Sequence, residues 1–280
     1  MLADRHHLQK LVTPFCYRLR THDIDQAAFL ARESGLRHSA RVTTWHKRYV
    51  LYPAWPPSQH YRHVLSGQIV LSRFPLEDNR RYLLPQPAAN PFVYNWFYLH
   101  RALQRVDVRL GPTRRLRLFN VHLEAFDVPN KERQAELLVD RVRAEATPHT
   151  VVLGDFNCVP PEAPLKHAFP DEPETDMRTD RTIATVRTLE GFAEAVEQGQ
   201  PGAALAGLST FPAAAPNRRL DYMYVNTAGL AVTAARVARE AGPISDHLPI
   251  VADLRWRDGD AAAAPDTDAA AQLDEGAAAE

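Results

Sequence analysis

The stretch that decides the fold is residues 149–157 (HTVVLGDFN), in which a short apolar run meets a glycine, an acid and an amide. An apolar run of this length that stops at a turn predicts a buried β-strand before Gly154. The glycine lets the backbone leave the sheet sharply. Asp155 and Asn157 are two residues apart, so their side chains point to the same side. The stretch therefore directs a carboxylate and an amide into one small volume, although a simple turn cap is an alternative use of such a pair.

A second polar group, Ser245, Asp246 and His247, directly precedes an apolar run over residues 248–251 that predicts another strand. At the mouth of a strand, an aspartate is a suitable ligand for a hard cation, and a neighbouring imidazole suits a phosphoryl oxygen. Taken alone, the pair is better explained as a turn aspartate beside a half-exposed histidine.

Two more polar residues lie in predicted strands. His122 falls in an alternating strand over residues 115–124, where a lone histidine is more often a hydrogen-bonded core residue than a catalytic one. Asp221 begins an apolar strand over residues 220–225. An acid at such a place costs free energy unless a partner uses its charge.

These motifs occur in a fixed order along the chain. They are residues 66–76 (SGQIVLSRFPL), 120–123 (NVHL), 154–157 (GDFN), 219–222 (RLDY) and 245–250 (SDHLPI). The series resembles the endonuclease/exonuclease/phosphatase family, which shares its scaffold with DNase I-like nucleases, neutral sphingomyelinases and inositol-phosphate phosphatases. The resemblance covers about residues 23–256 and implies an α/β fold: a four-layer sandwich of two packed mixed β-sheets flanked by helices.

The resemblance also implies catalytic roles. Asp155 would orient and deprotonate the attacking water, and Asn157 would position water or a phosphate oxygen. His247, held by Asp221, would contact the phosphoryl group. His122 would stabilise the charge that develops on the pentacoordinate phosphorus.

A metal site follows from the same resemblance, with Asp246, Asp155 and Asn157 in the metal sphere. Mg²⁺ is the expected ion because the ligands are hard oxygens, and Mn²⁺ is the alternative. Arg218 and Arg219 would add phosphate contacts or form a solvated pair.

One part of the family pattern is not recognisable. Family members begin with a strand that carries an asparagine and a second strand that ends in Gln-Glu, whose glutamate is the main metal ligand. Glu33 is the only glutamate before Glu77, and it lies near the end of a predicted helix. We therefore expect the first strands and the main metal ligand to be missing, either because the start of the sequence is wrong or frame-shifted or because the chain has lost that ligand. We therefore expect the protein to bind metal poorly and to have weak or no activity.

The remaining elements follow from periodicity and turn signals. Asp23 and Gly35 suit the two ends of a helix over residues 24–34. The other predicted elements are a strand over 68–72, a loop over 52–57, a helix over 130–146 and strands over 231–238 and 248–256.

Composition divides the chain into an unassigned segment (1–22), the main domain (23–257) and a tail (258–280) that contains seven acidic and no basic residues and is expected to be disordered. Without the tail, 33 basic residues face 27 acidic ones, a mild excess that suits an anionic substrate better than a nucleic-acid surface. No run of apolar residues is long enough to span a membrane, and two cysteines give no disulfide framework. We expect a cytoplasmic monomer.

The resulting hypothesis is a metal-dependent phosphoester hydrolase, a phosphodiesterase or phosphatase that acts on a small or lipid-derived phosphoester by in-line attack of water. A nuclease is possible but less favoured. The alternative from another class is a catalytically silent protein that binds phosphate-bearing ligands. A serine acyl hydrolase does not fit, because the sequence has no Gly-x-Ser-x-Gly elbow.

Overall fold

The computed structural model describes residues 15–17, 24–50, 55–60, 63–91, 95–96, 98–202 and 205–257. The predicted disordered tail and most of the unassigned segment 1–22 lie outside the described residues, as does the predicted helix cap Asp23.

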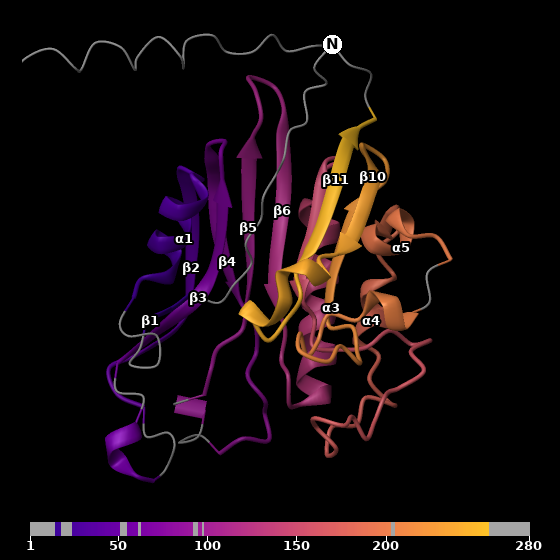
Figure 1. Cartoon of the computed structure of the whole chain (residues 1–280). Coiled ribbons are helices and arrows are strands. Elements are labelled where there is room, and N and C mark those ends of the chain that lie inside the picture. Colours follow the sequence, from indigo (N-terminus) through magenta and orange to yellow (C-terminus); the bar gives the residue numbers. More distant parts are fainter. Residues whose placement is uncertain are drawn as a thin grey trace, which may run out of the picture.

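A six-stranded mixed sheet forms the centre of the molecule (Figure 1). Strands β6 and β7 are parallel, and every other neighbouring pair in this sheet is antiparallel. In spatial order the strands are β4 (Leu76–Leu83), β5 (Ala102–Arg109), β6 (Arg115–His122), β7 (Thr150–Asp155), β9 (Asp221–Asn226) and β8 (Phe192–Glu194).

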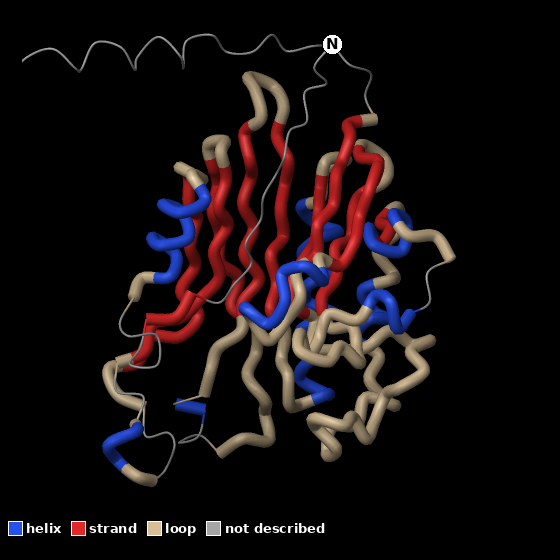
Figure 2. Tube along the Cα trace, in the orientation of Figure 1, coloured by secondary structure: helices blue, strands red, loops and turns tan. Residues whose placement is uncertain are grey.

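The second layer of strands consists of two separate sheets within the described residues (Figure 2). One sheet has the order β1 (Phe15–Tyr17), β3 (Val64–Ser72) and β2 (His38–Lys47). The other is the antiparallel pair β10 (Leu230–Val237) and β11 (Ile250–Trp256). The central sheet is therefore continuous, whereas the layer that faces it is divided.

Alternation along β6 shows how the layers pack. Leu116 and Leu118 belong to a core between the two strand layers, whereas Phe119 and Val121 belong to a core under helix α3 (Val128–Glu145). Successive strand residues point to opposite faces, so one strand serves both cores. Helix α1 (Gln26–Ser34) packs through a third core on the outer face of β3, and these four layers confirm the predicted α/β sandwich.

The predicted boundaries need one correction. Helix α1 begins at Gln26, because the side chain of Asp25, not that of Asp23, accepts a hydrogen bond from the Ala28 backbone N–H. Gly35 ends the helix in the left-handed conformation, as predicted. Sequence periodicity also missed several elements, namely β1, β2, β4, β5, β8 and the short helices α4 (Thr182–Val186) and α5 (Ala195–Gly199).

None of the helices in the described part of the chain is long and apolar enough to cross a membrane.

Candidate active site

The register of the central sheet brings three predicted site residues side by side. His122 at the end of β6 pairs with Asp155 at the end of β7, and Asp155 pairs with Asp221 at the start of β9. Directly paired residues project to the same face of a sheet. By alternation from Leu118 and Leu153, that face is the one that meets the second layer. Strand β6 ends at the lower edge of the sheet in Figure 1, so the group lies at that edge.

Gly154 makes this arrangement possible. Its φ of +143° is rarely adopted by residues with a side chain, and a Cβ atom there would lie 1.9 Å from the backbone oxygen of Val121. Only glycine lets β7 approach β6 this closely before Asp155.

The fourth member, His247, comes from the loop that precedes β11 in the second layer. Its Nδ1 lies 2.7 Å from Oδ2 of Asp221, and its Nε2 lies 4.0 Å from Oδ2 of Asp155. On the other side of Asp155, Nε2 of His122 lies 3.5 Å from the same oxygen. The ring of Phe211 packs against His247, with the centroids 4.7 Å apart. The two layers thus meet in a cluster of two histidines and two aspartates.

The environment separates the proton affinities of these groups. Burial, followed by the charge of Asp221, raises the pKa of Asp155 to about 7. Burial alone would disfavour charge on His247, but the hydrogen bond and charge of Asp221 outweigh it and raise the pKa of His247 to about 9. Burial, together with the positive charges of Arg101 and His247, holds the pKa of His122 well below its ordinary value. Near neutral pH the cluster therefore holds one charged and one neutral imidazole beside a carboxyl group that is close to half ionised.

Asn157 fixes the turn after Asp155. It has a φ of +51°, and its backbone N–H donates to Oδ1 of Asp155 at 2.8 Å. Its side-chain amide donates to the backbone oxygen of Leu123 at 3.0 Å, and the backbone oxygen of Asn157 accepts from Nζ of Lys131 at 2.6 Å. These contacts hold the Asp155 carboxylate in place and tie β7 to the end of β6.

Asp246 lies apart from the converging ligand atoms. Its carboxylate accepts a hydrogen bond from the Ser245 hydroxyl at 3.2 Å and is exposed, while its backbone oxygen accepts from the Ala213 N–H. The group whose ligand atoms all lie within 4.8 Å of one another consists of Asp155, Asp221 and His247.

The side chains of Arg218 and Arg219 are buried and make internal ion pairs. Arg218 pairs with Asp171 at 2.8 Å and lies over the ring of Phe211. Arg219 pairs with Glu194 and Glu197. Both guanidinium groups are thus already paired within the protein.

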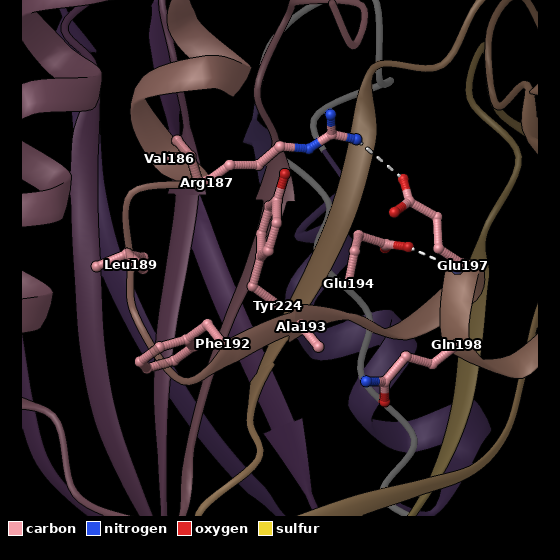
Figure 3. A pocket seen from close by; sticks show the side chains of 9 residues that line it. All are labelled: Val186, Arg187, Leu189, Phe192, Ala193, Glu194, Glu197, Gln198 and Tyr224. Atoms are coloured by element: carbon pink, nitrogen blue, oxygen red, sulfur yellow. Dashed lines mark hydrogen bonds and ion pairs between the residues drawn. The ribbon is translucent and has the colours of Figure 1, made fainter. Parts of the chain in front are cut away.

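The partners of Arg219 border a separate cavity of about 330 Å³ (Figure 3). Glu194 and Glu197 line this cavity from β8 and α5, together with Arg187 and Tyr224. The lining residues include none of the four cluster residues, so the cavity lies apart from the candidate active site.

Two buried residues beside His122 were not singled out from the sequence. Gln68 of β3 and Arg101, which directly precedes β5, both line a cavity of about 200 Å³ that reaches His122. Gln68 stood inside one of the recognised motifs, so a polar residue in an apolar strand was its signal. Arg101 carries no such signal, because its importance depends on what surrounds it in space.

A continuous mixed sheet packed against a second strand layer, with a histidine and aspartate cluster at one edge, defines the architecture of the DNase I-like α/β sandwiches. A model of the endonuclease/exonuclease/phosphatase family matches residues 19–247, and the chain belongs to that family. No curated protein matches the sequence significantly.

Similar solved structures support the fold. An endonuclease/exonuclease/phosphatase protein from Beutenbergia cavernae is 22% identical with a TM-score of 0.57, over 83% of this chain and 57% of that one. A Neisseria 3′ phosphatase bound to a product DNA hairpin is 23% identical with a TM-score of 0.54, over 88% and 89% of the two chains. A mannosyl-6-phosphatase from Bacteroides thetaiotaomicron is 14% identical with a TM-score of 0.53, over 88% and 85%. At these identities the likeness establishes the fold.

Proposed function

We propose that the chain is a metal-dependent phosphoester hydrolase whose active site consists of His122, Asp155, Asp221 and His247. The observation that carries the proposal is the contact of Asp155 with two histidines, one charged and one neutral near neutral pH, at the edge where the two strand layers join. Family membership and structural neighbours that are phosphatases by name support the reaction class.

The general base in this proposal is Asp155. In the metal-free protein its pKa is raised to about 7, which makes it a stronger base than an ordinary carboxylate, and a catalytic base is most effective when its pKa lies near the working pH. The hydrogen bond from the Asn157 N–H holds one carboxylate oxygen, which leaves Oδ2 toward the histidines to take a proton from the attacking water.

The two histidines serve the phosphoryl group in different ways. His247, charged near neutral pH and oriented by Asp221, donates from Nε2 to a phosphoryl oxygen and opposes its negative charge. His122 stays neutral and offers a hydrogen bond at Nε2 to the oxygen on which charge grows during in-line attack.

The donor set fits a weakly held divalent cation. Two carboxylates and an imidazole converge, but ligand atoms around one Mg²⁺ lie no more than about 4 Å apart, since each bond is about 2.1 Å. The ligand atoms here lie up to 4.8 Å apart, so they would have to move slightly closer together to bind one ion. Asp221 is also already hydrogen-bonded to His247. Asp155 is the first ligand in this proposal, and Asp246 and Asn157, which lie outside the converging group, would have to turn toward the ion to join it. A bound Mg²⁺ or Mn²⁺ would neutralise phosphate charge and lower the pKa of water.

Weak metal binding makes slow turnover the expected behaviour. The test is a titration of Mg²⁺ and of Mn²⁺ against bis-p-nitrophenyl phosphate, with the wild type, Asp155→Asn and the exposed-site control Asp253→Asn. We expect slow, metal-stimulated release of nitrophenol that survives in Asp253→Asn and is lost in Asp155→Asn. Turnover in ¹⁸O-labelled water should place the label in the phosphate product, because water attacks phosphorus.

The second candidate is a catalytically silent protein that binds phosphate-bearing ligands, which the small metal-ligand group favours. Metal-independent phosphate binding without any turnover, at every metal concentration, would select this candidate over the hydrolase. A small or lipid-derived phosphoester remains our preferred substrate over duplex nucleic acid, because the basic excess outside the tail is mild.

A further inference from the structure

A cavity of about 200 Å³ adjoins His122 and is lined by Ala102 of β5, which lies on the side of β6 away from Asp155 and Asp221 in the strand order of the central sheet. Trp45 of β2 and Gln68 of β3 line it from the second layer, and Arg101 and Ala102 line it from the central sheet. Three of these residues have a buried polar atom without a hydrogen-bond partner in the described part of the chain, namely Nε1 of Trp45, Oε1 of Gln68 and Nε of Arg101. Unpaired buried polar groups are rare and costly, so their gathering around one cavity points to a polar ligand.

The unpaired cation is unusual within this protein. Four arginines are buried among the described residues, and each exposes no more than 6% of its surface. Three of them, Arg105, Arg218 and Arg219, make ion pairs with carboxylates at 3.3 Å or less. Arg101 has no carboxylate within ion-pair distance in the described ranges, and a buried charge without a partner is strongly destabilising.

The charges around Arg101 leave room for an anion. Glu124 and Asp155 are the carboxylates that interact electrostatically with Arg101, and neither forms an ion pair with it. Oε1 of Glu124 is already held by the Tyr98 hydroxyl and two backbone N–H groups, whereas its Oε2 is buried without a hydrogen-bond partner among the described residues and does not reach Arg101 at ion-pair distance. At the same cavity, burial and the positive charges of Lys47 and Arg81 lower the pKa of His100. In the part of the chain that the structure describes, Arg101 is the one arginine or lysine that lines this cavity, and the positive charges of Lys47 and Arg81 reach His100 in its wall.

We propose that this cavity is a subsite for a second anionic group of the substrate, a compact phosphate or carboxylate distinct from the phosphoryl group that is hydrolysed. Arg101 and the indole N–H of Trp45 donate to the oxyanion, and Oε1 of Gln68 accepts from a hydroxyl group on the same ligand. The volume lies below the roughly 300 Å³ at which pockets for drug-sized ligands begin, which suits a compact group. The inference rests on the proposed function and narrows its substrate class to phosphoesters with a further negative charge.

The first test measures binding of inorganic phosphate and of acetate to the metal-free, full-length protein by calorimetry. We expect Arg101→Met to weaken binding at least tenfold, and by more than His247→Gln does. Arg133→Met, which removes an exposed arginine on α3, is the matched control and should bind as the wild type does. Preference for phosphate or for acetate identifies the oxyanion. Loss of binding in His247→Gln with retention in Arg101→Met would overturn the subsite, as would a wild type that binds neither anion.

The second test is thermal unfolding in buffer free of both anions. Arg101→Met should raise the unfolding midpoint, because it removes a buried cation without a partner. A lower midpoint would show that protein groups hold Arg101 and would overturn the proposal. The subsite and the hydrolase hypothesis can fail independently. If phosphate binding depends on Arg101 but no turnover occurs, the subsite stands and the hydrolase hypothesis is wrong. If turnover occurs but phosphate binding is unchanged in Arg101→Met, only the subsite is wrong.

Discussion

The two strand layers hold the candidate active site in different ways. The central sheet is continuous, and its hydrogen-bonded register places His122, Asp155 and Asp221 next to one another. The second layer is divided, and it contributes His247 through a loop that the Asp221 hydrogen bond ties to the cluster. Three of the four site residues are thus fixed by backbone pairing, and the fourth depends on side-chain contacts. Changes to the central sheet should therefore cost more stability, and changes to the His247 contact should cost more activity.

The largest effect is expected for Gly154→Ala. The new Cβ atom would lie 1.9 Å from the backbone oxygen of Val121, and backbone atoms cannot move aside as a flexible side chain does. We expect a loss of at least about 4 kcal/mol in the free energy of unfolding, or no folded protein at all. Gly35→Ala is the control, since that glycine also has a positive φ but has no atom within 4 Å of the new Cβ, and it should cost about 1 kcal/mol. Equal losses in the two variants, measured by urea unfolding, would contradict the close approach of β6 and β7.

A matched pair of leucines compares the layers directly. Leu153 of β7 exposes 5% of its surface, whereas Leu254 of β11 is half-buried, and both belong to the core between the layers. Leu153→Ala should lower the free energy of unfolding by about 3 kcal/mol, as is typical of a fully buried leucine. Leu254→Ala should lower it by about 1 kcal/mol, since water already reaches that position. Denaturant unfolding of both variants measures the two losses in the free energy of unfolding. A larger loss for Leu254→Ala would contradict the claim that the central sheet contributes more to stability than the second layer.

Asp221→Asn should separate activity from stability. The amide can still contact His247 but carries no charge, so the pKa of His247 should fall and its imidazolium should be lost near neutral pH. We expect turnover of bis-p-nitrophenyl phosphate to fall about a hundredfold, equivalent to about 3 kcal/mol of transition-state stabilisation. NMR titration of the His247 ring provides a readout that does not depend on activity. An unchanged pKa of His247 would remove Asp221 from its orienting role.

The pH dependence of stability should reveal the same contact. The pKa of His247 is raised to about 9 in the folded protein, above its ordinary value of 6.5, so the folded state binds the extra proton between these values. The stabilisation is complete below pH 6.5 and is lost as the pH rises through 9. We expect the free energy of unfolding of the metal-free protein to fall by about 3 kcal/mol over this range, and by less in His247→Gln. A flat profile in the wild type would contradict the His247–Asp221 pairing.

Sequence patterns predicted the parts of the fold whose burial is regular. Strands β7 and β9 and helix α3 have apolar residues at constant spacing, and the structure places them within a few residues of the predicted bounds. Strand β4 (LEDNRRYL) was missed because all of its side chains are exposed or half-buried. It is a strand because β5 pairs with it, and single-sequence periodicity does not report pairing.

The candidate site shows the same division. His122, Asp155, Asp221 and His247 stood in recognisable motifs, and the structure brings them together. The internal ion pairs of Arg218 and Arg219 and the unpaired charge of Arg101 depend on which acidic residues lie near each of them in space. That information lies in the packing of distant segments, so charge alone did not distinguish these three arginines along the sequence.

The most direct test of the central claim is a joint measurement of turnover and stability in Asp155→Asn at pH 8. An aspartate whose pKa is raised from 3.8 to about 7 by burial destabilises the folded protein whenever it is ionised. The account predicts that the variant loses at least about 99% of its metal-stimulated hydrolysis, a hundredfold effect typical of a lost catalytic base. It also predicts that the unfolding midpoint rises. A variant that unfolds more easily while it keeps its turnover would show that Asp155 is a structural residue, and the proposed active site would be wrong.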